Sequence, residues 1–192
     1  MWRFARTVMS NYAPLPASGF SASWHNRHDG STTSVSLRWE NEGWTADGTI
    51  EADDVQFVLR ISPMWQVQQF LLFRDLDEPD LWLATDQRGR WGEVNGAHRT
   101  DLDGCVDLAL AGTPFTNTVP IRRLPLHHGH SAQQNVILVD TETLAVVPVN
   151  QTYAMLGANT WRYFCMFTGE EVEGTVDEYG LLVADASFER VA

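Results

Sequence analysis

The chain has 192 residues, of which 44% are hydrophobic and 11% are aromatic, so it has ample material for a packed core and is not a disordered chain. Its net charge is −12, and all 13 basic residues are arginines. This acidic balance disfavours nucleic acid as a partner and disfavours general adhesion to anionic lipid surfaces.

The first 22 residues mix Pro14, Pro16 and Gly19 with little periodicity, which predicts an N-terminal arm (1–22) before a single domain (23–192). The opening residues contain no apolar run typical of a secretion signal. No segment reaches the roughly 20 apolar residues of a membrane span. We therefore expect a cytoplasmic protein without stable membrane insertion.

Two early segments alternate apolar and polar residues, as half-buried strands do. They read SVSLRW (34–39) and VQFVLRI (55–61). Turn signals such as Asp47-Gly48 and Asn95-Gly96 separate the runs, which indicates antiparallel hairpins.

The next strand, MWQVQQFLLF (64–73), breaks the alternation, because Gln69 shares a face with the apolar Trp65 and Leu71. One interpretation is a β-bulge near Gln68 that resets the register. The other is a polar group that projects into a cavity containing something polar.

One short helix is predicted in VPIRRLPL (119–126), where Pro120 is tolerated early and Pro125 forces the end. The later strands, NVILV (135–139), LAVVPV (144–149) and WRYFCMF (161–167), are apolar on both faces. With almost no helix to cover the second face, we predict an all-β protein whose sheet is closed or strongly curled, with a packed or a hollow interior.

The cluster HHGH (127–130) lacks the spacing of a metal site, and we interpret it as an exposed polar loop. Cys105 and Cys165 lie in apolar runs and are expected to be buried thiols, with a single bridge as the alternative. No nucleophile elbow, P-loop or dinucleotide fingerprint is present. The sequence therefore predicts neither an enzyme nor a bound metal or cofactor.

Asp107 lies inside an apolar strand, where an unpaired charge is costly. Arg122 or Arg123 is its candidate partner, in a structural ion pair. The stretch before these arginines, TPFTNTV (113–119), carries turn and cap formers that shape a loop. The functional alternative places hydroxyl, amide and guanidinium donors at one rim of an apolar cavity, which suits an amphiphile with a polar or anionic head.

Across these segments the chain resembles a bacterial family named Putative glycolipid-binding. The matching motifs are Trp24, GRW (89–91), LDGCVD (102–107), TPFTNTVPIRRL (113–124), QTY (151–153), WRYF (161–164) and DEYGLLV (177–183). The resemblance spans residues 23–190. The chain departs from the pattern near DGSTTS (29–34), where the usual Glu is missing, and at DLAL (107–110).

The resemblance implies a large, curved antiparallel sheet that forms an incomplete barrel around an apolar cavity, with at most one or two short helices. It is similar in outline to periplasmic lipoprotein carriers. It also implies a non-catalytic binding or carrier protein for an amphipathic lipid or glycolipid.

Aromatic residues are expected to line or pack the cavity. One residue with an amide side chain and two arginines are expected near its polar end. They are Trp39, Phe57, Trp65, Phe70, Trp161 and Phe164 for the first group, and Asn117, Arg122 and Arg123 for the second. Two alternatives stay open: an interaction domain with a filled core and no ligand, and an enzyme acting on a lipid-like substrate with Asp107 or His128 as acid/base.

Overall fold

Every strand that the structure describes belongs to one 14-stranded sheet, which confirms the predicted all-β fold. The computed structural model describes residues 11–75, 78–86, 88–93 and 95–192. The strands follow one another in the order β7-β6-β5-β4-β3-β2-β1-β14-β13-β12-β11-β10-β9-β8. One α-helix and three short 3-10 turns are the helical elements of the described residues.

The sheet consists of two antiparallel meanders. The first contains β1 (Phe20–Asn26), β2 (Thr32–Glu40), β3 (Gly43–Ile50), β4 (Val55–Ile61), β5 (Val67–Phe73), β6 (Leu81–Thr85) and β7 (Trp91–Glu93). The second contains β9 (Ser131–Val139), β10 (Val146–Met155), β11 (Thr160–Cys165), β12 (Glu170–Val176), β13 (Leu182–Ala184) and β14 (Phe188–Arg190).

The first and last strands join the two meanders, because β1 pairs antiparallel with β14 in the middle of the sheet. Trp24 of β1 lies opposite Arg190 of β14, and its indole N–H donates to the carbonyl of Leu182 at 2.8 Å. One strand departs from the predicted antiparallel pattern: β8 (Asp107–Leu110) pairs parallel with β9. A parallel partner needs a long connection, and here that connection contains the helix.

The sheet curls into an incomplete barrel, because its edge strands β7 and β8 do not pair with each other. Two hydrogen bonds cross this seam. The indole N–H of Trp91 donates to the carbonyl of Cys105 at 2.9 Å, and the amide of Gly104 donates to the carbonyl of Gly89 at 2.8 Å. The predicted incomplete barrel is therefore confirmed, and its seam is bridged by the loop that leads into β8.

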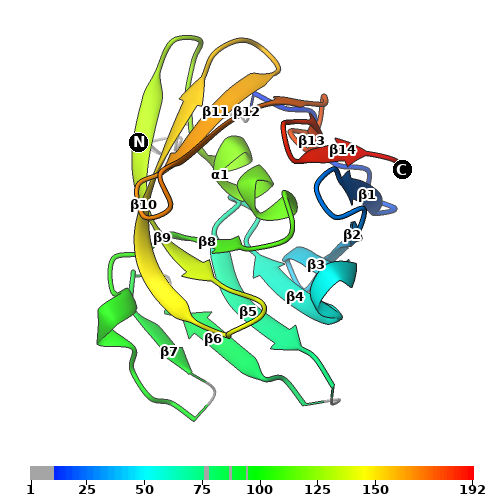
Figure 1. The fold of residues 1–192 in the computed structure, drawn as a ribbon. Helices are drawn as coiled ribbons and strands as arrows, with labels where there is room; N and C mark the ends of the chain where they lie inside the picture. Colours follow the sequence, from blue (N-terminus) through cyan, green and yellow to red (C-terminus); the bar gives the residue numbers. More distant parts are fainter. Residues whose placement is uncertain (1–10, 76–77, 87, 94) are drawn as a thin grey trace, which may run out of the picture.

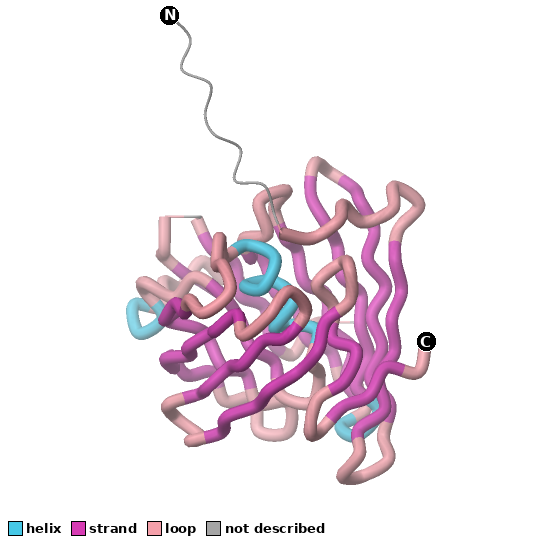
Figure 2. Tube along the Cα trace, turned by 90° about the horizontal axis from the view of Figure 1, so that it is seen from above, coloured by secondary structure: helices cyan, strands magenta, loops and turns pink. Residues whose placement is uncertain are grey.

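The helix α1 (Thr118–Arg123) lies inside the curl of the sheet, with strands on several sides of it (Figures 1 and 2). Val119 of the helix and Phe115 of the preceding turn are both fully shielded from solvent. Two crevices that reach this segment have volumes of about 90 and 10 Å³. The interior around α1 is thus packed by the chain itself.

The irregularity of β5 is the predicted β-bulge. Arg60 of β4 lies opposite Gln69, but the next residue, Ile61, lies opposite Val67, so Gln68 is the extra residue. Trp65 precedes the strand and has a left-handed φ of 59°. The bulge explains how apolar residues on both sides of Gln68 reach the same core.

The cysteines, the histidine cluster and the N-terminal arm can be compared with their predictions. Cys105 and Cys165 are free and buried, and the histidine cluster is exposed, as predicted. Of the predicted arm, residues 1–10 lie outside the described residues. Tyr12 and Leu15 are buried, and β1 already begins at Phe20.

Candidate functional site

The segment from Thr113 to Leu126 forms the centre of the candidate site, and we call it the plug. It opens with a 3-10 turn at Phe115–Asn117 and continues as α1. Pro120 lies in the first turn of α1, where the missing N–H has no intrahelical partner to lose. The helix ends at Arg123, and the next residue, Leu124, is extended as expected for a residue before proline.

Arg122 of the plug is buried, with 7% of its surface exposed. Its guanidinium donates to the carbonyl of Tyr179 and, at 3.1 Å, to the carbonyl of Ala13. It also lies over the ring of Trp65, 4.3 Å from the centroid. Burial lowers the pKa of Arg122 to about 10, although Asp177 acts in the opposite direction. Arg122 therefore ties the plug to two backbone segments and an aromatic ring.

Arg123 forms the ion pair that the sequence predicts for Asp107. The Asp107 side chain is 1% exposed, and only its Oδ2 atom is bonded, because Oδ1 has no partner among the described residues. Burial raises the pKa of Asp107, and the neighbouring Arg123 opposes that rise. Arg123 also donates to Oε1 of Gln134 at 3.3 Å. The pair joins the plug to β8 and β9.

Asn117 is the third polar residue of the plug. Its Oδ1 accepts a hydrogen bond from the hydroxyl of Tyr153 at 3.1 Å, and the same hydroxyl lies 2.7 Å from Oε1 of Gln151. Asn117 also bonds the side chain of Tyr163. Burial holds the pKa of both tyrosines above the ordinary value, so their hydroxyls remain hydrogen-bond donors.

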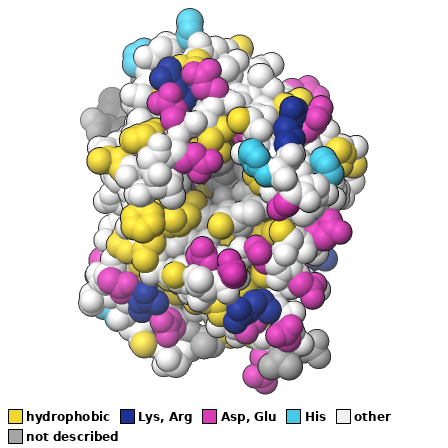
Figure 3. All heavy atoms as spheres, viewed as in Figure 1, with side chains coloured by type: hydrophobic (Ala, Val, Ile, Leu, Met, Phe, Trp, Pro, Cys, Tyr) yellow, Lys and Arg dark blue, Asp and Glu magenta, His cyan; other side chains and the backbone are white. Residues whose placement is uncertain are grey.

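A narrow cleft separates one face of α1 from β11, β12 and β13. Its lining is mainly apolar and consists of Pro114, Asn117, Thr118, Ile121, Trp161, Tyr163, Gly174, Val176 and Leu182. The side of the molecule shown in Figure 1 is hollowed where α1 lies (Figure 3). The cleft volume of about 10 Å³ has room for about one water molecule.

The six predicted site residues fall into four places. Arg122 and Trp65 contact each other, and Asn117 and Trp161 line the same cleft. Arg123 borders the crevice at the seam. Phe57 is buried below β3, and its ring fills the position that a Cβ on Gly48 would occupy. The structure therefore brings four of the residues together as two pairs, leaves Arg123 and Phe57 apart from them, and does not gather all six around one space.

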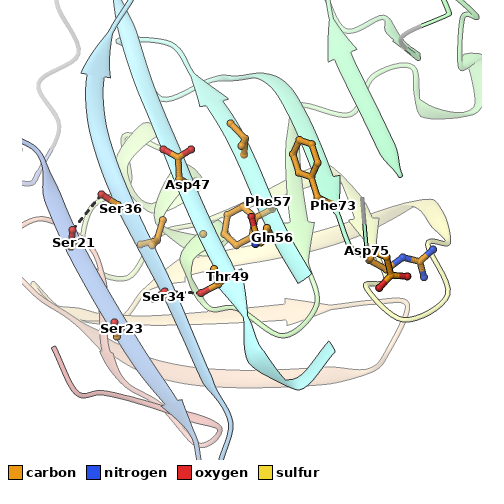
Figure 4. A pocket seen from close by; sticks show the side chains of 14 residues that line it. Ser21, Ser23, Ser34, Ser36, Asp47, Thr49, Gln56, Phe57, Phe73 and Asp75 are labelled. Atoms are coloured by element: carbon orange, nitrogen blue, oxygen red, sulfur yellow. Dashed lines mark hydrogen bonds between the residues drawn. The ribbon is translucent and has the colours of Figure 1, made fainter. Parts of the chain in front are cut away.

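The outer face of the sheet carries a groove that the sequence did not predict. A groove of about 740 Å³ crosses β1 to β5 (Figure 4). Its lining consists of Ser21, Ser23, Ser34, Val35, Ser36, Asp47, Gly48, Thr49, Gln56, Phe57, Val58, Phe73, Arg74 and Asp75. The only sequence signal was small polar residues at every second position, which is also the pattern of any solvated sheet face.

The described part of the chain contains no group of three or more His, Cys, Asp and Glu side chains that could hold a metal ion. Among its helices, none is both long and apolar enough to cross a membrane.

Comparison with known proteins gives one family and one structure. A family model described as "Putative glycolipid-binding" matches residues 21–190. The crystal structure of a DUF1089 family protein from Pseudomonas aeruginosa is similar, with a TM-score of 0.65 and 24% sequence identity. The match covers 100% of this chain and 99% of that one, and it concerns the fold alone. No curated protein matches the chain at a significant level.

Proposed function

Because the chain belongs to the "Putative glycolipid-binding" family, we propose that it is a non-catalytic binding protein for an amphipathic lipid or glycolipid. The observation that carries this proposal is the apolar cleft beside α1. Trp161, Ile121 and Leu182 offer apolar surface there, while Asn117 and Tyr163 place polar groups on the same walls. This combination matches a ligand with an apolar tail and a hydrogen-bonding head.

The cleft must widen before a tail can enter, since its volume of about 10 Å³ is far below that of an acyl chain. Widening requires α1 to move away from β11 and β12. Burial of each CH₂ group then contributes about 0.8 kcal/mol, which offsets the contacts that the movement breaks. Binding is therefore coupled to displacement of the plug.

The filled interior favours a second candidate, an interaction domain without a ligand. The aromatic residues that would line a cavity are packed, with Phe57 1% and Trp161 2% exposed. Asp107, one of the two acid/base candidates of the enzyme alternative, is buried in the pair with Arg123, which supports a structural role for this carboxylate. The lipid-binding protein and the interaction domain without a ligand differ in what happens when a lipid is added.

Native mass spectrometry with a monoglucosyl diacylglycerol separates them. We expect a one-to-one complex with the unmodified protein. Gly174→Ala should weaken it, because the new Cβ would lie 2.7 Å from Cδ1 of Leu182 on the cleft wall. Gly157→Ala is the matched control, because its Cβ would meet only ordinary contacts at 3.7 Å or more.

Thermal unfolding of both variants shows whether each is folded under the conditions of the binding experiment. A bare chain at every lipid concentration, or equal binding by the two folded variants, contradicts the proposed site.

A further inference from the structure

We propose that the groove on the outer face of β1 to β5 is a binding site for a neutral saccharide. This site is separate from the cleft beside α1, and the proposal does not depend on lipid binding. The groove has a volume of about 740 Å³, within the range of roughly 300–1,000 Å³ that is usual for small-molecule sites. That volume accommodates several sugar rings.

The groove is built from two adjacent rows of side chains, one across β1 to β4 and the other across β1 to β5. The strand register places Ser21, Ser36, Asp47 and Val58 in the first row. It places Ser23, Ser34, Thr49, Gln56 and Phe73 in the second. Since successive residues of a strand point to opposite faces, every member of both rows lies on the outer face. The rows are held on strands, so the polar groups are positioned before a ligand arrives.

The rows change character along the groove. Hydroxyl groups occupy the part over β1 and β2, and Ser21 and Ser34 bond the neighbouring hydroxyls of Ser36 and Thr49 at 3.4 and 2.8 Å (Figure 4). The part over β4 and β5 carries Val58 and the half-buried Phe73. Saccharides present both kinds of surface, with hydroxyl groups on the rim of each ring and C–H groups on its faces. The partly accessible ring of Phe73 provides an apolar surface for such a face.

A contact below the groove supports its floor. A Cβ on Gly48 would lie 2.2 Å from Cζ of Phe57, so the Phe57 ring occupies the space beneath β3 where a side chain would otherwise project. The glycine allows the ring to approach the backbone closely. The same two residues line the groove from below.

The charges of the groove disfavour ionic ligands. Asp47 is paired with Arg38 at 2.7 Å, and Arg74 is paired with Asp80 at 3.6 Å. Asp75 adds one negative charge, and the whole protein is acidic, so phosphate and nucleic acid are repelled. Peptides that add a strand require a free sheet edge, but β1 to β5 are paired on both sides. With anionic ligands and strand-adding peptides disfavoured, a neutral polyhydroxyl ligand is the class that fits the groove.

Two polar side chains in the groove are available to such a ligand. Neither Ser23 nor Gln56 makes a side-chain hydrogen bond to a described residue, and they lie in the same row. Amide and hydroxyl groups both donate and accept, as sugar hydroxyls do. These side chains can bind a saccharide without breaking a bond of the fold.

The test is an amide chemical-shift titration of the labelled protein with maltotriose, cellotriose and mannotriose. We expect at least one trisaccharide to give saturable shifts confined to β1–β5, with a dissociation constant in the millimolar range. Ser23→Ala and Gln56→Ala should each weaken this binding by about three- to tenfold. The matched controls are Ser131→Ala and Gln133→Ala, which remove the same groups from exposed positions on β9 and should not alter it.

Three results would overturn the proposal. They are no shifts in β1–β5 with any trisaccharide, equal binding by the groove and control variants, or stronger shifts of the same amides with inorganic phosphate. The trisaccharides have no apolar tail, and Gly174→Ala leaves the groove unchanged. Failure of the lipid experiment and failure of this one are therefore distinguishable.

Discussion

The guanidinium of Arg122 lies 4.3 Å from the centre of the Trp65 ring, and Trp65 in turn stacks on Trp44 with 6.5 Å between ring centroids. Trp44 contacts Trp39, which is 47% exposed, so a line of aromatic rings leads from the buried arginine to the surface. The cation is held by a ring face and two carbonyl groups, without a carboxylate at ion-pair distance among the described residues.

Arg122→Lys should lower the free energy of unfolding by about 1–3 kcal/mol. An ammonium group keeps the charge but cannot bond two carbonyl groups and cover an aromatic face at the same time. Urea unfolding followed by tryptophan fluorescence measures the loss. Arg38→Lys, whose side chain is 57% exposed, should change stability by less than about 0.5 kcal/mol. Equal effects of the two substitutions would contradict a special role for the buried position.

Asp107→Asn should reveal a pH dependence of stability. Burial raises the pKa of Asp107 in the folded state above the unfolded value of about 3.9. Between these two values the folded state binds more protons than the unfolded state, so the free energy of unfolding falls as the pH rises. Asparagine does not titrate. The stability of the unmodified protein relative to Asp107→Asn should therefore decline as the pH increases above about 4.

Urea unfolding at a series of pH values measures this difference, and Asp101→Asn provides a control of opposite sign. Hydrogen bonds from Arg99 lower the pKa of Asp101, so its carboxylate stabilises the fold above the unfolded pKa and this contribution is lost as the pH falls. A pH-independent difference for Asp107→Asn would show that its carboxyl has an ordinary pKa.

Gly48→Ala should destabilise the protein by about 1–3 kcal/mol, because the Phe57 ring must leave its position. The same substitution should cost less in a Phe57→Leu background, where the side chain is shorter. A double-mutant cycle on unfolding free energies gives this coupling. Additive effects of the two substitutions would mean that the ring and the glycine are energetically independent.

Glu42→Gly should stabilise the protein by about 0.5–1 kcal/mol. Asn41 and Glu42 form the two-residue turn between β2 and β3, with φ values of 49° and 60°. Such a turn strongly prefers Asn-Gly, because only glycine adopts positive φ without strain. Thermal unfolding measures the gain. Glu171→Gly, in the extended backbone of β12, should instead lower stability.

Several elements that depend on local pattern were predictable from the sequence, but the turn predicted at Asp47-Gly48 was wrong, because both residues lie inside β3. The alternation of apolar and polar residues predicted β4, and the interruption of this alternation in the next strand indicated the bulge at Gln68. Asp107, an acidic residue inside an apolar strand, required a cationic partner, and that partner is Arg123. These inferences hold because period, register and the cost of an unpaired charge are local properties of the chain.

The remaining features depend on contacts between distant segments. Nothing local distinguishes Arg122, which turns toward Trp65, from its neighbour Arg123, and nothing in β8 signals a parallel partner. The rows of the outer groove arise only when serines from β1 and β2 come beside Asp47 and Gln56. A single sequence also does not show whether a curled sheet is hollow. The plug that fills this sheet is a loop with six helical residues, and nothing in its local sequence signals that it lies inside the curl.

The pairing of β1 with β14 has a consequence for synthesis of the protein. The two meanders share no other pair of neighbouring strands in the order, so the sheet stays in two pieces until Phe188–Arg190 has left the ribosome. Until then β1 presents an open edge that invites pairing with other chains. Synthesis of β14 therefore covers this edge of β1 and joins the two meanders into one sheet.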